Sequence, residues 1–240
     1  MSPPILATEG LGKRFGGVVA TEDVTLSIAT AELRCIIGPN GAGKSTLFKL
    51  LCGLEAPDRG RVVFKGEDVT RLPAFQRVRR GLGMTFQTNR TYHALSVRQN
   101  LATPLRVHRA DRSADADARY ALALERFGLD AEADHAAREL PHHRLQWLEM
   151  AMVLAGGPDL ILLDEPTAGM SPEETRQTAS VLRELNARGL TIVVVEHDIA
   201  FVREVAQNVT VLHQGRVFAQ GSIDEITAHE DVRRIYLGRA

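Results

Sequence analysis

Long apolar runs are missing from this 240-residue sequence, which narrows the classes of protein it can belong to. Runs such as residues 160–163 and 192–195 are far short of the roughly 20 apolar residues that a membrane-spanning helix needs. No signal peptide pattern opens the chain, and no internal repeat is found. We therefore expect a soluble chain without a membrane-spanning segment.

Cysteine and excess charge are scarce as well. Cys35 and Cys52 are the only two cysteines and lie among apolar residues, so we expect buried core thiols in a reducing cytoplasm. The 29 Lys and Arg residues nearly balance the 30 Asp and Glu residues, giving a net charge of −1 and no basic field for nucleic acid. Hydrophobic residues make up 44% of the sequence, enough for the core of one large domain or of a domain with a subdomain.

A glycine-rich segment between an apolar run and a helical pattern predicts a phosphate site. It matches G-x-x-x-x-G-K-[ST] and consists of Gly38, Pro39, Asn40, Gly41, Ala42, Gly43, Lys44, Ser45 and Thr46. Glycines let backbone N–H groups turn toward a polyphosphate, and the following helix adds the positive end of its dipole. Lys44 can reach the β- and γ-phosphates, and the Ser45 hydroxyl can ligate Mg²⁺. The alternative is a chance glycine-rich turn, against which the acidic strand end described next argues.

An apolar run that ends in two acids predicts the second part of this site. Residues 160–163 lead into Asp164 and Glu165, as in a buried parallel strand whose carboxyl end is exposed. In phosphate-loop ATPases such an aspartate holds Mg²⁺, and the glutamate is placed to orient or deprotonate the attacking water. A second buried strand, residues 191–195, leads to His197. His197 is either a structural histidine or a ligand group, and its place at a parallel strand end favours the second.

Two more residues are candidates for nucleotide contact. Phe15 lies between predicted strands at residues 5–9 and 18–28, and it either caps a small β-layer or stacks on a purine. Gln87 follows a predicted strand at residues 82–86, where a loop residue is the ordinary interpretation.

The remaining pattern predicts a mixed α/β chain. Residues 74–80 are typical of a basic helix with a solvated face, and residues 106–119 of a mobile link inside a helical, Ala-rich insert at 95–128. Adjacent His142 and His143 invite a zinc hypothesis, but no second pair of ligands accompanies them. Other predicted elements are strands at 61–65, 209–213 and 216–220, helices at 47–54, 140–154 and 172–188, and small helices to the end of the chain.

Together these residues resemble the nucleotide-binding subunit of an ABC transporter, in the family's order and over essentially the whole chain. The resemblance implies a phosphate-loop (RecA-like) α/β ATPase core with an antiparallel β subdomain and a helical subdomain. Residues 1–240 would form a single ABC ATPase domain. Within it, residues 1–86 and 155–220 would form the core with its β subdomain, 87–154 the helical subdomain, and 221–240 C-terminal helices.

The resemblance also implies residue roles. Phe15 would stack on adenine, and Lys44 with the loop amides would hold the phosphates of ATP. Ser45, Gln87 and Asp164 would contact Mg²⁺, with Glu165 as catalytic base and His197 as sensor of the γ-phosphate.

The partners implied are those of an ABC transporter. Two ATPase subunits, identical or more often different in this branch, would sandwich two ATP molecules, each between one loop and the other subunit's signature motif. Residues after Gln87 would contact transmembrane permease subunits at the cytoplasmic face of the cell membrane. A periplasmic or extracellular solute-binding protein would be an indirect partner, and nucleic acid would not be one.

A finer resemblance is to importers of branched-chain amino acids, amides and urea. It is carried by RFGG at residues 14–17, AGM at 168–170, VTVLHQG at 209–215, FAQGS at 218–222 and IYLG at 235–238. The sequence QWLE at 146–149 is most similar to the urea-type ATPases.

The sequence departs from this family at the signature motif. The family reads LSGGQ or, in this branch, LS-x-G-[EQ], whereas residues 140–144 read LPHHR. Pro141 lacks the signature hydroxyl, and the His143 side chain obstructs approach to its own N–H. Each lost contact to phosphate would slow hydrolysis about tenfold to a hundredfold, unless His142, His143 or Arg144 replaces it. Ser171 also stands where an aspartate is usual.

These departures predict a heterodimer with one competent and one weakened site. Two alternative functions remain at this point. One is a soluble ABC ATPase acting on nucleic acid or ribosomes, and the other is a regulatory ATP-binding subunit with little hydrolysis.

Overall fold

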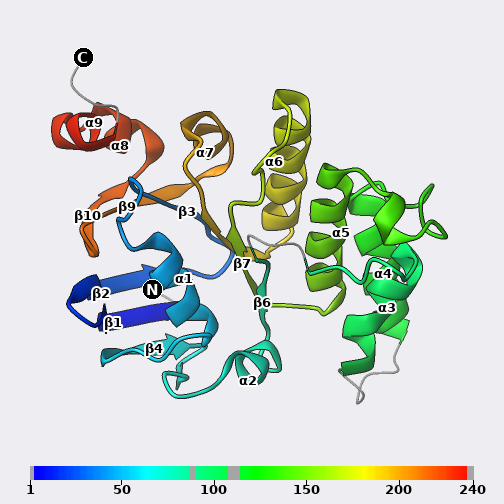
Figure 1. Cartoon of the computed structure of the whole chain (residues 1–240), viewed down its shortest axis with the longest axis horizontal. Helices are drawn as coiled ribbons and strands as arrows, with labels where there is room; N and C mark the ends of the chain where they lie inside the picture. The colour runs from blue at the N-terminus through cyan, green and yellow to red at the C-terminus, as the bar shows by residue number, and fades with distance from the viewer. Residues whose placement is uncertain (1–2, 87–89, 108–113, 237–240) are drawn as a thin grey trace.

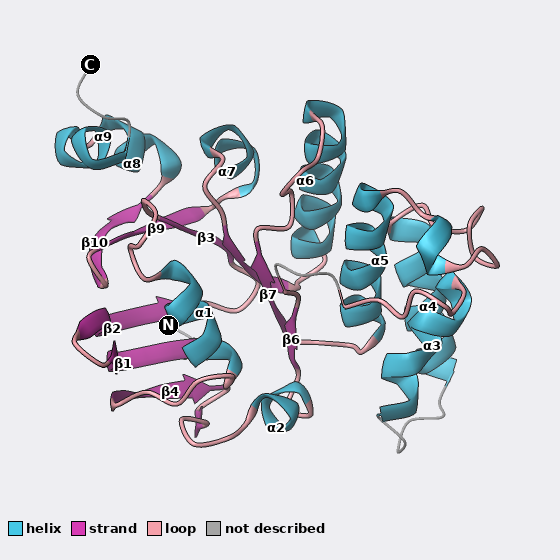
Figure 2. Cartoon of the chain, in the orientation of Figure 1, coloured by secondary structure: helices cyan, strands magenta, loops and turns pink. Residues whose placement is uncertain are grey.

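The computed structural model describes residues 3–86, 90–107 and 114–236, and these form two β-sheets with helices between and around them (Figures 1 and 2). The strands are β1 (Leu6–Phe15), β2 (Val18–Ile28), β3 (Leu33–Ile37), β4 (Arg59–Phe64), β5 (Glu67–Asp68), β6 (Leu82–Met84), β7 (Leu160–Asp164), β8 (Thr191–Val195), β9 (Asn208–His213) and β10 (Arg216–Gly221). The helices are α1 (Lys44–Cys52), α2 (Ala74–Val78), α3 (Val97–Val107), α4 (Ala114–Arg126), α5 (His142–Ala155), α6 (Pro172–Ala187), α7 (Ile199–Val205), α8 (Ile223–Ala228) and α9 (Glu230–Tyr236), with a 3₁₀ turn at Ala137–Glu139.

The central sheet has the order β10-β9-β3-β8-β7-β6, in which all neighbours are parallel except β10 and β9. Its inner strands are mostly apolar because both faces are covered. In β8, Ile192 and Val194 pack into the core on one face, while Val193 and Val195 pack into the core on the other. This twofold alternation explains why the sequence shows continuous apolar runs at these strands.

Helix α1 lies between the central sheet and a second, antiparallel sheet of order β2-β1-β4-β5 (Figure 1). Leu47, Leu50 and Leu51 of α1 are buried among side chains of both sheets. The opposite face of the central sheet carries α6 and α7, and α5 packs with α3 and α4 beyond the β6 edge, at the right of Figure 1. Within the described residues, no helix has the length and apolarity that a membrane crossing requires.

The structure confirms the predicted α/β fold and most of its elements, and both cysteines are fully buried. Several boundaries were wrong. The first strand extends to Phe15 rather than ending at residue 9, because register shifts after Thr8 interrupt its alternating pattern. Strand β6, at the edge of the central sheet, ends at Met84 rather than at residue 86. Helix α1 begins at Lys44 rather than at residue 47. Pro141 precedes the first turn of α5 instead of belonging to it.

Two predictions about charged segments were also wrong. Helix α2 ends at Val78, and its Arg77 is fully buried rather than part of a solvated face. The Arg77 guanidinium donates to four backbone carbonyls, among them those of Leu50 and Leu51 at the end of α1, so burial is compensated. The predicted link at 106–119 is helical up to Val107 and from Ala114 onward, and its residues 108–113 lie outside the described residues.

Candidate functional site

The residues that follow β3, β8 and β7, three neighbouring parallel strands of the central sheet, lie at one edge of that sheet. Ile36 of β3 and Asp164 of β7 both pair with Val195 of β8, so the ends of these strands lie side by side. The glycine-rich loop follows β3, the two acids end β7, and residues 196–198 follow β8. Ligands of parallel α/β sheets bind at such carboxyl ends.

The glycine-rich loop is fixed by close approaches that only glycine permits. A Cβ on Gly38 would lie 2.4 Å from the Leu212 carbonyl oxygen. Gly43 has φ 98° and would place a Cβ 2.3 Å from the Ala20 oxygen, on the second sheet. Helix α1 starts directly after Gly43 without any side-chain cap, so the N–H groups of its first turn remain available to an anion.

Lys44 points back over this loop. Its ammonium donates to the Gly38 carbonyl at 2.6 Å and to the Pro39 carbonyl at 3.1 Å, and the residue is 8% exposed. Burial lowers the pKa of Lys44 from its usual value, while the charges of Glu165 and Asp164 oppose that shift. The positive charge therefore lies between the loop and the acidic strand end.

Asp164 and Glu165 form a pair of carboxylates with unfavourable surroundings. Burial, together with the charge of Glu165, raises the pKa of Asp164 to about 6 even though Lys44 opposes it. Glu165 has φ 49°, in the left-handed region that non-glycine residues rarely occupy. Strained backbone at a strand end and carboxylates held together are features of functional sites.

His197 lies against this pair. Its Nδ1 is 3.6 Å from Glu165 Oε1 and 3.4 Å from Glu196 Oε2, and its side chain is 61% exposed. Glu196 is 1% exposed and accepts hydrogen bonds from the His197 N–H at 2.8 Å and from the hydroxyl of Thr167. The buried Glu196 carboxylate thus fixes the segment that carries His197 to the loop that follows Glu165.

Phe15 ends β1 in the second sheet and is 46% exposed, with the Lys13 ammonium 5.4 Å from its ring centre. Since β2 of the same sheet contacts Gly43, this sheet is packed against the glycine-rich loop. Ser45 is exposed in the first turn of α1. Gln87, the remaining predicted contact, lies outside the described residues.

A glycine-rich loop, an acidic strand end and a histidine on adjacent parallel strands match the expected geometry, and comparison with known proteins gives the family. The sequence pattern described as ABC transporter matches residues 21–168. The chain belongs to the ABC transporter family. As a member of that family it is an ATP-binding ABC-type ATPase.

Individual ABC proteins are similar over the full length of the chain. The high-affinity branched-chain amino acid transport ATP-binding protein LivG of Salmonella typhimurium (strain LT2) is 36% identical over 100% of both chains. The crystal structure of the ADP conformation of MJ1267, an ATP-binding cassette of an ABC transporter, is 29% identical with a TM-score of 0.88, covering 99% of this chain and 100% of that one. A dimeric post-hydrolysis structure of the ATP-binding cassette MJ0796, bound to ADP and Pi, is 26% identical with a TM-score of 0.80, covering 91% and 98%.

The segment in the signature position of this ABC protein, residues 140–144, is held by its neighbours. His143 Nδ1 is 2.8 Å from Glu174 Oε1, and the His143 ring makes an edge contact with Trp147. The Arg144 guanidinium donates to the carbonyls of Phe127 and Gly128 and pairs with Glu132 at 2.8 Å. These two side chains are therefore engaged within the subunit.

The beginning of α5 differs from that of α6. Pro141 precedes α5 and offers no side-chain cap, and His142 Nε2 lies 3.2 Å from the Ala168 carbonyl. Ser171, in the place of the usual aspartate, forms a capping box at the start of α6 with Glu174. Glu174 thus takes part in the N-terminal cap of α6 and also contacts the His143 ring.

Sequence reasoning missed the supporting residues of this site. It did not single out Glu196 or Thr167, because their roles depend on the packing of β8 against β7. It used Glu149 only as part of a resemblance, although Glu149 is 6% exposed and burial raises its pKa to about 7. A charged residue at a core-facing position of a helical pattern was the available signal in that case.

Proposed function

We propose that this chain binds and hydrolyses Mg²⁺-ATP to drive an importer of a small polar solute, such as a branched-chain amino acid, a short amide or urea. The observation that carries the proposal is the convergence of Lys44, Glu165 and His197 at the ends of three adjacent strands. The full-length similarity to a branched-chain amino acid transport subunit supports the solute class. The urea-type resemblance remains a prediction.

Each residue would contribute to one step of hydrolysis. The loop amides and the start of α1 would bind the phosphates, and Phe15 would stack on the adenine. Lys44 would exchange its two loop carbonyls for the β- and γ-phosphates, since a phosphate offers a stronger, charged acceptor. Glu165 would orient or deprotonate the attacking water, and His197, beside Glu165, would donate to the γ-phosphate.

The residues at the end of β7 fit a divalent cation. Burial, and after it the charge of Glu165, raises the pKa of Asp164 to about 6, and a bound cation would favour the ionised form of both carboxylates. Ser45, Asp164 and Gln87 are the proposed ligands. Bound there, Mg²⁺ would supply charge neutralisation at the β- and γ-phosphates.

We further propose that this subunit works in an asymmetric pair. Its own loop and acids would hold one ATP, and a partner's signature motif would complete that site. At the second site, Pro141 provides no hydroxyl, and the rings of His142 and His143 contact the Ala168 carbonyl and Glu174. Because His143 and Arg144 are bound to Glu174 and Glu132, they are poorly placed to replace the lost phosphate donors.

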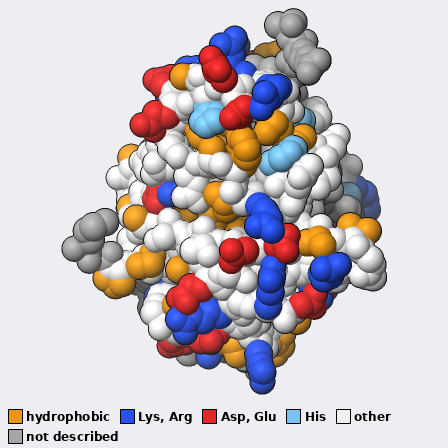
Figure 3. All heavy atoms as spheres, turned by 90° about the vertical axis from the view of Figure 1, so that its left-hand side faces the viewer, with side chains coloured by type: hydrophobic (Ala, Val, Ile, Leu, Met, Phe, Trp, Pro, Cys, Tyr) orange, Lys and Arg blue, Asp and Glu red, His pale blue; other side chains and the backbone are white. Residues whose placement is uncertain are grey.

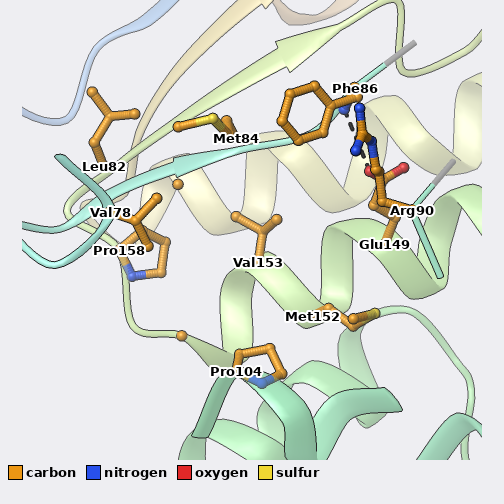
Figure 4. Close-up of a pocket in the computed structure, with 12 residues that line it drawn as sticks. Val78, Leu82, Met84, Phe86, Arg90, Pro104, Glu149, Met152, Val153 and Pro158 are labelled. Carbon is orange, nitrogen blue, oxygen red and sulfur yellow. Dashed lines mark hydrogen bonds between the residues drawn. The ribbon is translucent and has the colours of Figure 1, made fainter. Parts of the chain in front are cut away.

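Transmembrane permease subunits would bind at the groove between β6 and α5, so the chain would be peripheral at the cytoplasmic face of the membrane, with a solute-binding protein as indirect partner. This groove has a volume of about 240 Å³ and an apolar lining that includes Met84, Met152 and Val153 (Figure 4). Residues 87–154 would form the helical subdomain that moves with the permease, beside a core of residues 1–86 and 155–220.

Nucleic acid is a poor fit as a partner. The net charge is −1, and on the face shown in Figure 3 the Lys and Arg side chains are interleaved with Asp and Glu rather than gathered into a stripe. A regulatory subunit that binds ATP without hydrolysis is favoured by the altered signature. Against it stand Lys44, Asp164, Glu165 and His197 around one site.

Solute uptake and co-purification test this function together. Purification through this chain from its native membrane should recover polytopic membrane subunits, and Lys44→Ala should abolish ATP-dependent uptake by that complex. Exposed Lys49→Ala, on the same helix, serves as the matched control for loss of a positive charge. Recovery of ribosomes or nucleic acid in place of membrane subunits would contradict the proposal.

A further inference from the structure

Two side chains of α5 bond the loop that follows Glu165. His142 Nε2 lies 3.2 Å from the Ala168 carbonyl oxygen, and Gln146 Nε2 donates to the same oxygen at 3.1 Å. Because a carbonyl oxygen only accepts, this contact requires the His142 ring to carry a proton on Nε2. Residues 142 and 146 are four apart and lie on one face of the helix, so both side chains can reach a single acceptor.

The bonded carbonyl lies within one turn of Glu165. The Ala168 N–H donates to the Glu165 carbonyl at 3.1 Å, which closes that turn. The next residue, Gly169, has φ 76°, and a Cβ there would lie 3.3 Å from His142 Nε2. The loop therefore packs directly against the His142 ring, and its position is coupled to the start of α5.

Glu165 needs such support because its backbone has a rare conformation. Its φ of 49° lies in the left-handed region, which a residue other than glycine keeps only where surrounding contacts fix it. The Glu165 N–H donates to the Val195 carbonyl at 2.9 Å, and the Thr167 hydroxyl donates to Glu196. The bonds to Ala168 add an attachment from α5 to these attachments from the end of β8.

Stability alone does not explain the amide of Gln146. Its Oε1 is buried and has no hydrogen-bond partner among the residues that the structure describes. A buried acceptor without a partner costs free energy, and an apolar side chain of the same length would avoid that cost. What Gln146 adds, and an apolar residue would not, is the bond to the Ala168 carbonyl.

We propose that His142 and Gln146 are positioning residues that fix Glu165, through the Ala168 carbonyl, at this subunit's own nucleotide site. This inference rests on the proposed function, in which Glu165 orients or deprotonates the attacking water. A histidine in the place of a signature glycine would thus serve the ATP of its own subunit, in addition to lying near the partner's ATP. Loss of the two bonds would lower kcat and leave ATP binding, which depends on Lys44 and its loop, unchanged.

The transporter complex purified through this chain tests the inference. The catalytic glutamate of the partner ATPase subunit is changed to glutamine, so that the measured hydrolysis depends on Glu165. Gln146→Met keeps the length of the side chain without its donor, and kcat should fall about threefold to tenfold while KM stays within about twofold. His142→Ala alone should cost about twofold to threefold because its bond is exposed, and the two changes together about tenfold to a hundredfold.

Thermal unfolding and two further variants separate positioning from general stability. Gln146→Met should unfold at the same temperature as the wild type or higher, because it removes the unpaired Oε1. On the Gln146→Met background, His142→Gln supplies an amide donor in place of Nε2 and should keep the rate that His142→Ala loses. Gln177→Ala removes an exposed amide from α6 and is the matched control, with no change in rate expected.

Three results would count against the inference. A double variant as fast as Gln177→Ala, or a fall in kcat matched by an equal rise in KM, would overturn it. If the double variant does not fold, Gln146→Met carries the test, and an unchanged kcat there would overturn it as well. A complex whose hydrolysis is indifferent to Glu165→Gln would instead overturn the proposed function, because there would be no base to position.

Discussion

The starts of α1 and α5 are both helix N-termini without a side-chain cap, yet the residues that surround them differ. Before α1, Gly43 carries no side chain. The Lys44 ammonium donates a hydrogen bond to the Gly38 carbonyl, which it can exchange for a phosphate oxygen. Before α5, Pro141 offers no hydroxyl, and the first residues of the helix, His142 and His143, are bound to neighbours. We therefore expect the two helix starts to differ as phosphate sites although both carry the same dipole.

The two helix starts would act on different nucleotides. The start of α1 would serve this subunit's own ATP, whereas the start of α5 would serve the partner's ATP. We therefore expect changes at the first to be costly and changes at the second to be mild or even beneficial.

The largest expected effect is at Glu165. Glu165→Gln keeps the shape of the side chain but removes the base, so ATP hydrolysis by the complex should fall about a hundredfold to ten-thousandfold. The equivalent change in the partner subunit should cost much less, because its site lacks a working signature. The rates of the two singly changed complexes are compared directly, and equal losses would show that the two sites are equivalent.

The C-terminal end of α1 depends on Arg77, so we expect a change at Arg77 to lower the stability of the fold. Replacing Arg77 with Met leaves the carbonyls of Leu50 and Leu51 without their buried donor. Unfolding by denaturant should show a loss of about 2–4 kcal/mol. Arg79→Met, at an exposed position next to α2, is the matched control and should stay within about 0.5 kcal/mol. If Arg77→Met left the free energy of unfolding unchanged, the guanidinium would not be needed to satisfy the carbonyls at the end of α1.

Restoring the second helix start should raise activity. The double change Pro141→Ser and His143→Gly returns a hydroxyl and removes the His143 side chain at the start of α5. Hydrolysis at the partner's nucleotide should rise about tenfold to a hundredfold. The measurement uses complexes whose other site is disabled by Glu165→Gln, and an unchanged rate there would break the proposed contrast between the helices.

The smallest effect concerns Asp164 in the absence of nucleotide and Mg²⁺. Its pKa of about 6 in the fold lies above the usual 3.8, so stability falls as pH rises between these values and stays low above them. Asp164→Asn removes that fall and should stabilise the chain by on the order of 1–2 kcal/mol at pH 8. Thermal unfolding from pH 4 to 8 should show the two proteins converging toward pH 4. A constant difference across this range would mean that Asp164 titrates normally.

The sequence was sufficient for the parts of the site that depend on local pattern. The loop from Gly38 to Thr46, the acids after β7 and His197 after β8 were found because each follows a recognisable apolar strand. Sheet order then brought them together, as parallel connections require. The α/β fold followed from the same alternation of strands and helices.

Contacts between distant segments were not accessible in this way. In the sequence Arg77 is part of a basic stretch. Only the fold shows that it donates hydrogen bonds to the carbonyls of Leu50 and Leu51 at the end of α1, which lie 27 and 26 residues away in the sequence. Likewise, Glu149 bonds Phe86 from 63 residues away, and Glu174 both caps its own helix and holds His143. Such side chains act through tertiary hydrogen bonds, which have no signature in local periodicity.

ATP affinity of the purified full chain tests the central claim most directly. Titration with ATP should show tight binding that weakens when Mg²⁺ is removed and disappears in Lys44→Ala, while Pro141→Ser leaves it unchanged because that residue would contact only a partner's nucleotide. Binding that is indifferent to Mg²⁺ and survives Lys44→Ala would contradict the assignment of the nucleotide to this loop.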